Sequence, residues 1–337
     1  MKRNFFLIGF TLFCSLRLTM FGQTLSPSLL EVEIQNHRGY TLDVADVSQL
    51  AKSPSLPAST AAPAAFRSTI LIGDIVSVNG TPVKGTVFER IISLSSSPTL
   101  TPGTAIADSA RGGIYEWNLD FLNPDGTPIG RILVQGMSGG PPPPGAPSEI
   151  SRASYIVVGG TGAFLGVRGG YFQNDIDASA PVLITSAAED PAYRRINGGG
   201  NTHAHLYLIP ASRPAIVATP GGPAVTHSTD FTLVSASKPA AVGEILSIYA
   251  TGLGPTRPSV DAGKPFPASP LVAVASPVSV TVNGKPAEVL AAVGFPGAID
   301  GYQVNFRLPA DTAPGTATVQ VSAAWIAGSE VKIPVGQ

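Results

Sequence analysis

Two histidines on one predicted strand are the clearest candidates for a chemical role. His203 and His205 are two positions apart, so a strand places both side chains on the same face, as two ligands of a metal ion would be. A zinc site needs a third protein ligand, and the sequence offers only His37, Asp175 and Asp177 as candidates. We therefore predict a polar strand face at this position and no metal site.

Other common catalytic and binding motifs are absent. The segment 159–166 is rich in glycine, but a phosphate-binding loop also needs a following helix and, in the nucleoside-triphosphate type, a Lys-Ser/Thr pair. The sequence has no Gly-x-Ser-x-Gly elbow. A formal net charge of -1, with 13% charged residues, excludes the basic surface of a nucleic-acid-binding protein. We predict no cofactor and no nucleic-acid partner.

Residues 1–22 have the pattern of a secretory signal peptide. Lys2 and Arg3 precede an apolar run over 5–13, and Gly22 provides a small residue for cleavage. The run is too short for a membrane span, which needs about 20 residues. Cys14, the single cysteine, lies inside this segment, so the mature chain would have neither disulfides nor thiolate chemistry. We expect an exported, soluble chain without an integral membrane span.

After the signal, the sequence has the pattern of strands. Apolar and polar residues alternate with a period of two in the first predicted strand, namely Leu30, Val32 and Ile34 against Glu31, Glu33 and Gln35. Further short β-branched runs are 70–78, 86–94, 114–122, 130–135, 155–158 and 203–209. Asn79-Gly80 and the segment 123–126 are turn sequences. No window keeps a helical period, so we predict an all-β protein.

The chain divides near a Pro- and Gly-rich segment at 210–223. A second series of strands follows, at 245–250, 278–282, 287–291, 302–308, 316–321 and 331–335. We predict a barrel over 28–210, a linker over 211–223 and an immunoglobulin-like sandwich over 224–337. Two Pro-rich segments, 53–63 and 139–147, are expected to be loops, with a polyproline recognition motif as the alternative for the second.

The most distinctive segment is 157–169, Val-Val-Gly-Gly-Thr-Gly-Ala-Phe-Leu-Gly-Val-Arg-Gly. Its glycines permit a tight bend, and Phe164 supplies a large apolar anchor. The segment closely resembles the GGTGxFxGxxG turn of the allene oxide cyclase and dirigent families, which are eight-stranded antiparallel barrels of the calycin type. The segment 71–76 is similar to a Gly-Asp-Leu-Val element of the cyclases. The resemblance implies a barrel for a small hydrophobic molecule, and a homotrimer.

The resemblance also implies site residues. The cyclases use a glutamate on the first strand and a water held by asparagine inside the barrel. Glu33 matches that glutamate in position, Asn79 falls one residue from a second expected position, and Gln35 stands where an asparagine is expected. Glu33 and Asn79 are thus the implied catalytic residues, and the predicted ligand contacts are Gln35, Phe164, His203 and His205. In the alternative interpretation, the polar face of the first strand meets solvent.

The second domain resembles a different family. The segments 249–256 (Tyr-Ala-Thr-Gly-Leu-Gly-Pro-Thr), 280–287 (Val-Thr-Val-Asn-Gly-Lys-Pro-Ala), 301–306 and 308–315 occur in order. Together they resemble the C-terminal domain that recurs in secreted proteins of Acidobacteria such as Solibacter, which is similar to IPT/TIG immunoglobulin-like modules. That family has no attached activity, so the resemblance implies a bacterial spacer or docking module. Tyr302 and Trp325 are expected to pack in its core, with sugar stacking as the alternative.

Three functions stay open. The first is a secreted protein whose barrel binds a small hydrophobic ligand. The second is an isomerase, cyclase or dirigent-like stereocontrol protein, which requires Glu33 to face the barrel interior in an apolar environment. The third is a purely structural exported protein whose barrel is packed solid. We expect the binding function, and we do not expect catalysis.

Overall fold

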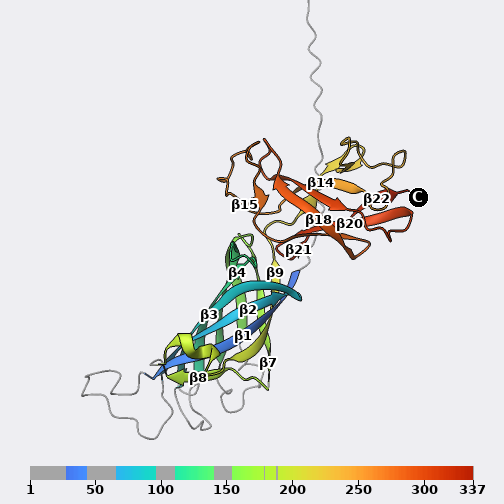
Figure 1. The fold of residues 1–337 in the computed structure, drawn as a ribbon. Coiled ribbons are helices and arrows are strands. Elements are labelled where there is room, and N and C mark those ends of the chain that lie inside the picture. Colours follow the sequence, from blue (N-terminus) through green and yellow to red (C-terminus); the bar gives the residue numbers. More distant parts are fainter. Residues whose placement is uncertain are drawn as a thin grey trace, which may run out of the picture.

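The structure is a computed structural model that describes residues 28–43, 66–95, 111–139, 154–177, 179–186 and 189–336. The predicted signal peptide with Cys14, the segment 53–63 and nearly all of 139–147 lie outside these residues. The described residues form strands and one short 3-10 helix, η2 (Pro191–Arg195), but no α-helix. The prediction of an all-β chain is therefore confirmed. Figure 1 shows two assemblies of strands, one built from strands within 28–209 and one from strands within 215–335.

The first assembly is a sheet that closes on itself. Its strands are β1 (Ser28–Asp43), β2 (Phe66–Val78), β3 (Thr81–Ser95), β4 (Arg111–Leu122), β5 (Pro128–Gly139), β6 (Ser154–Gly162), β7 (Arg168–Ile176), β8 (Leu183–Ser186) and β9 (Gly200–Ile209). Because β1 pairs antiparallel with both β2 and β9, the order β1-β2-β3-β4-β5-β6-β7-β9 forms a ring (Figure 1). The short strand β8 is attached to this ring and runs parallel to β1.

Two predicted turns connect neighbouring strands of the ring. Asn79 and Gly80 connect β2 to β3 with positive φ angles of 49° and 72°, as a two-residue hairpin turn of the Asn-Gly type requires. The segment 123–126 connects β4 to β5, and the Gly126 N–H donates to the carbonyl oxygen of Asn123 at 2.8 Å. Both turn predictions are confirmed.

Apolar side chains fill the middle of the ring. On β1 the alternation points Leu30, Val32 and Ile34 inward, and each is at most 1% exposed. The largest buried side chains from the other strands of the ring include Trp117, Phe121, Ile132 and Leu206. At the level of these residues the ring therefore encloses a packed core. A small barrel is either filled by side chains in this way or holds one small ligand.

A bulge in β1 changes which side chains face the core. The pairing of β1 with β2 shifts between Gln35 and Arg38, and Asn36 adopts a φ of 50°. The bulge places His37 inside, fully buried, with its Nδ1 3.1 Å from the Thr202 hydroxyl oxygen and its ring edge-on to Trp117. Burial lowers the pKa of His37 to about 4, so the imidazole is neutral at physiological pH.

The second assembly consists of two sheets that share the strand β18 (Lys285–Gly294) and of a separate two-stranded hairpin. Its elements are β10 (Ala215–Ile216), β11 (Ala218–Thr219), β12 (Gly222–Pro223), β13 (Val225–His227), β14 (Ile245–Thr251), β15 (Thr256–Arg257), β16 (Ala273–Val274), β17 (Val278–Val282), β18 (Lys285–Gly294), β19 (Gly301–Arg307), β20 (Gly315–Ala323), β21 (Ile326–Ala327) and β22 (Val331–Val335). The first half of β18 pairs with β17 and the second half with β19, with a register shift between Val289 and Ala291. The bulge lets the sheet bend around a core that includes Ile248, Phe306 and Val319.

The segment between the two assemblies contains short strands. This segment, 211–223, is predicted as a linker, but it carries β10, which pairs with β14, and the small hairpin β11–β12.

In the part of the chain that the structure describes, no helix has the length and apolar character to cross a membrane.

Candidate functional site

The structure brings together three of the residues predicted for the site, but on the outer face of the ring. Glu33 lies opposite His203 in the pairing of β1 with β9, and Glu31 lies opposite His205. These four side chains line a shallow pocket of about 280 Å³ together with Ser77 and Gly80. Glu33 is exposed, because it alternates with residues that point into the core. The isomerase or cyclase alternative requires Glu33 to face the barrel interior, and this position does not meet that requirement. The interpretation in which the polar face of the first strand meets solvent fits the position of Glu33.

Two other predicted site residues, Asn79 and Phe164, make contacts that stabilise the fold. Asn79 accepts a hydrogen bond from the Glu31 N–H at 2.8 Å through its side-chain oxygen, and so ties the β2–β3 turn to β1. Gln35 is exposed on the outer face. Phe164 is buried against Phe121, with ring centroids 5.3 Å apart, and anchors the β6–β7 turn. Among the described residues, no group of three or more His, Cys, Asp or Glu side chains is arranged to hold a metal ion.

A polar cluster near β8 also has a structural explanation. Asp74, within the cyclase-like segment 71–76, forms ion pairs with Arg194 and Arg195 of η2. Arg38 pairs with Glu189 at 3.0 Å. These contacts fasten the η2 segment to β1 and β2, and both carboxylates are already paired with arginine.

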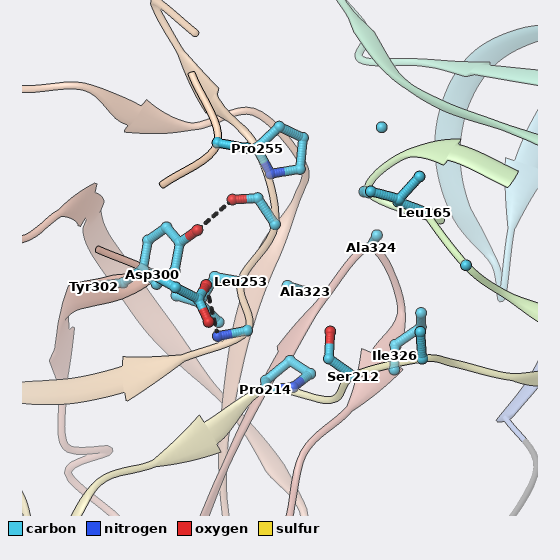
Figure 2. Close-up of a pocket in the computed structure, with 17 residues that line it drawn as sticks. Leu165, Ser212, Pro214, Leu253, Pro255, Asp300, Tyr302, Ala323, Ala324 and Ile326 are labelled. Carbon is cyan, nitrogen blue, oxygen red and sulfur yellow. Dashed lines mark hydrogen bonds between the residues drawn. The ribbon is translucent and has the colours of Figure 1, made fainter. Parts of the chain in front are cut away.

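A larger pocket lies between the two assemblies, and we call it the interdomain groove. It has a volume of about 630 Å³. One wall is the β6–β7 turn, including Gly162 and Leu165, and the opposite wall is the segment 252–255 with Asp300 and Tyr302. Figure 2 shows Leu165 across the groove from Tyr302 and Pro255. The two glycine-containing motifs that stand out in the sequence thus face each other across one pocket.

Glycines and two polar side chains shape the second wall. Gly252 and Gly254 have φ angles of 73° and 86°, which fold the chain back after β14. The Tyr302 hydroxyl donates to the carbonyl oxygen of Gly254, and the Gly252 N–H donates to the Asp300 carboxylate at 3.3 Å (Figure 2). Burial, reinforced by Asp300, raises the pKa of Tyr302, so its hydroxyl stays protonated. These bonds fix the backbone of the wall in place.

The electrostatics of the interdomain groove disfavour an anionic occupant. Its lining consists mainly of Gly, Ala, Pro, Leu and Ile, and Asp300 and Tyr302 are the ionisable side chains among the lining residues. A carboxylate or phosphate ligand would find no Lys, Arg or His on these walls to offset its desolvation. The groove suits a small apolar molecule with a few hydrogen-bonding atoms.

A hairpin turn lines one end of the groove and also packs against the core of the ring. Ala324 and Trp325, between β20 and β21, both have positive φ angles, 47° and 61°. Ala324 and Ile326 belong to the core of the first assembly, and the Trp325 ring lies 6.1 Å from that of Phe121. The β20–β21 turn of the second assembly thus completes the core of the first.

We expect Trp325→Ala to lower the free energy of unfolding by about 2 kcal/mol, because it removes a partly buried indole from the end of the ring. Urea unfolding followed by circular dichroism measures this effect. Leu165→Ala is the matched control, since Leu165 is 74% exposed on the facing turn and its loss should change stability by less than about 0.5 kcal/mol. Equal effects of the two substitutions would contradict the role of Trp325 as a seal.

Comparisons with known proteins give little further information. No protein-family model matches the chain, and no curated protein matches it. A solved structure described as a polysaccharide lyase aligns over 92% of this chain and 40% of its own length, with 10% identity and a TM-score of 0.18. The chain thus spans less than half of that protein. A likeness this weak carries no argument about fold or activity.

Proposed function

We propose that this chain is a secreted two-domain β protein that binds a small, uncharged, largely apolar ligand in the interdomain groove. The observation that carries the proposal is a groove of about 630 Å³ whose walls are apolar and lack basic side chains. Pockets of this size and composition are typical of small-molecule sites. The position between two assemblies is also a frequent one for ligands.

The groove is a better candidate than the interior of the ring. Trp117, Phe121 and Leu206 already fill the centre of the ring, so a ligand there would have to displace core side chains. An isomerase acting through Glu33 receives no support, because this side chain is exposed on the outer face.

We further propose that the ring is a barrel of the dirigent and allene oxide cyclase type and that the second assembly is an immunoglobulin-like domain. The closure of the ring through β1 and the sequence of the β6–β7 turn support the first part. The Asn283-Gly284 hairpin and the sheet order of the second assembly support the other. Export is supported by Lys2, Arg3 and the apolar run that follows them.

The test is a titration of the mature protein with Nile red, an uncharged apolar dye that fluoresces strongly outside water. Ala262 lines the groove and is exposed, so Ala262→Phe fills the groove without disturbing a core. We expect saturable binding to the unmodified protein and a loss of affinity of at least about tenfold in Ala262→Phe. Ala268→Phe, an exposed position in the same loop that does not line the groove, is the control and should bind normally.

Two outcomes would count against the proposal. If Ala262→Phe binds Nile red as well as the unmodified protein does, the dye binds elsewhere and the groove is not the site. If no saturable binding occurs at any dye concentration, the groove is only an interface, and a purely structural role is favoured.

A further inference from the structure

The sheet formed by β14, β19 and β18 has an outer face that points away from the core of the second assembly (β14 and β18 are labelled in Figure 1). On β19 the side chains of Tyr302, Val304 and Phe306 belong to that core. Strand alternation therefore places Gln303 and Asn305 on the outer face. Both side chains are half-buried, so solvent reaches part of each.

The strand register brings two aromatic side chains to the same outer face. Tyr249 on β14 lies opposite Gln303, and the Phe295 N–H, just after β18, donates to the carbonyl oxygen of Gly301 at 2.8 Å. Gly301 lies between the two outer strands and has no side chain to separate the aromatic rings, whose centroids are 5.5 Å apart at an interplanar angle of 83°. Phe295 is 40% exposed, so a ligand can reach its ring, while Tyr249 holds that ring from the side.

A chain of hydrogen bonds fixes the amide of Asn305 beside these rings. The side-chain oxygen of Asn305 accepts from the Ser247 hydroxyl at 3.0 Å and from the Gln303 amide nitrogen at 2.9 Å. Because the Ser247 hydroxyl donates to Asn305, Ser228 is the donor in the 2.8 Å contact between the two serine hydroxyls. The orientation of the Asn305 amide is thus set by three neighbouring side chains.

This arrangement leaves one donor group and one acceptor group available at the surface. Asn305 uses its oxygen twice and presents its side-chain N–H groups, and Gln303 uses one N–H and presents its side-chain oxygen. Among the residues that the structure describes, neither of these groups has a partner. A hydrogen-bond donor and an acceptor therefore lie side by side next to an exposed aromatic ring.

The charged side chains next to this surface already neutralise each other. Arg307 follows Asn305 on the same face of β19 and is paired with Glu288 of β18 at 2.9 Å. An anionic or cationic ligand would have to compete with this ion pair for a partner. The surface therefore suits an uncharged ligand with a flat apolar body and hydroxyl groups at its edge.

We propose that this surface, which we call the Phe295 platform, binds an uncharged sugar chain of β-linked glucose or xylose residues. Equatorial hydroxyls leave only C–H bonds on the flat faces of such sugars, and these faces stack on an aromatic ring. Each hydroxyl can donate and accept, so neighbouring hydroxyls match the N–H groups of Asn305 and the oxygen of Gln303. Neither these side chains nor Phe295 line the interdomain groove, so the proposal does not depend on the function proposed there.

The experiment measures binding of cellohexaose and xylohexaose to the mature protein by isothermal titration calorimetry. We expect Phe295→Ala to weaken binding by about tenfold, because the stacking surface is lost. Asn305→Asp keeps the oxygen that Ser247 and Gln303 use but removes the N–H donors, and should weaken binding by about threefold to tenfold. Phe88→Ala is the matched control, since Phe88 is a 42% exposed phenylalanine on β3 of the ring, and it should bind normally.

Two further variants separate stacking from packing and from the groove. Phe295→Trp retains an aromatic face and should keep the affinity, whereas a role of Phe295 in packing alone would give no such rescue. Ala262→Phe fills the interdomain groove and should leave sugar binding unchanged.

Three results would overturn the proposal. If Phe295→Ala binds both sugars as well as the unmodified protein does, the platform is not the site. If neither sugar binds at millimolar concentration, Phe295 serves only to cover Tyr249. If Asn305→Asp leaves both affinities unchanged, or Ala262→Phe abolishes them, the sugars are recognised elsewhere.

Discussion

Replacing Glu89 with glutamine is expected to stabilise the folded protein, by an amount that grows as the pH rises. In the unfolded chain this carboxyl loses its proton near pH 4.5, whereas burial holds the pKa of the folded state well above that value. Above pH 4.5 the folded protein therefore binds one proton more than the unfolded chain. Its stability then falls by about 1.4 kcal/mol per pH unit until the folded pKa is passed. Glutamine removes this loss and keeps the shape of the side chain.

His37 has the opposite effect over part of the same range. Burial lowers its pKa from 6.5 to about 4, so between these values the unfolded chain binds the extra proton. The contribution of His37 is fully present above pH 6.5 and is lost as the pH falls toward 4, again by about 1.4 kcal/mol per unit. From pH 4.5 upward the two slopes oppose each other in the unmodified protein, as long as the pH lies below both 6.5 and the folded pKa of Glu89. Above pH 6.5 the slope from His37 is absent.

Urea unfolding between pH 4.5 and 8 measures these slopes. Compared with the unmodified protein, Glu89→Gln should show stability that rises with pH up to 6.5, and His37→Gln should show stability that falls with pH. The slope is the readout, so a general loss of stability in His37→Gln does not obscure it. Glu31→Gln, at an exposed glutamate of β1, is the control and should keep the original profile. Parallel pH profiles for Glu89→Gln and the unmodified protein would contradict the prediction.

Gly160→Ala is expected to destabilise the protein by about 1–3 kcal/mol or more. A methyl group at this position would lie 2.4 Å from the carbonyl oxygen of Phe164 and 2.8 Å from that of Arg131. Both are backbone atoms, so relief requires moving the β6–β7 turn away from β5. Since this turn is one wall of the interdomain groove, weaker Nile red binding should accompany the loss of stability.

The neighbouring glycine provides the control for this substitution. A methyl group at Gly159 meets no atom within 4 Å, and the residue is not at positive φ. Gly159→Ala should therefore be neutral, or stabilise slightly by reducing the freedom of the unfolded chain. Urea unfolding of the two variants side by side measures the difference. If they behave alike, the close approach of the backbone at Gly160 is not what constrains the motif.

The parts of the fold that follow local rules could be predicted from the sequence. The alternation around Leu30, Val32 and Ile34 predicted the core face of β1, and Asn79-Gly80 and the segment 123–126 predicted the turns between their strands. β7 was not predicted as a strand, because its glycine pair at 169–170 interrupts the apolar pattern. The two-residue period of the sequence does not predict the bulge at Asn36, although this bulge is what turns His37 inward.

The candidate sites were harder to predict, because each depends on residues far apart in the chain. The interdomain groove joins Gly162 to Gly254, and no local pattern relates these two positions. Glu89 was missed because a charged residue is usually assigned to the surface. Its spacing of two residues from Val87 and from Ile91, which places all three on one face of the strand, was the signal that would have placed it inside. The resemblance, in contrast, drew attention to Glu33, whose alternation already indicated the outer face.

The position of the sealing turn has a consequence for how the chain matures during synthesis. β1 is the first strand of the ring to leave the ribosome, but its second partner, β9, begins only at Gly200. The ring therefore cannot close until residues up to Ile209 have emerged. Even then the end beside Phe121 stays uncovered until Ala324, Trp325 and Ile326 of the second assembly are synthesised. A chain cut short before this turn would display aromatic core surface to the quality-control machinery of the cell. The β20–β21 turn thus ties burial of that surface to synthesis of the second assembly.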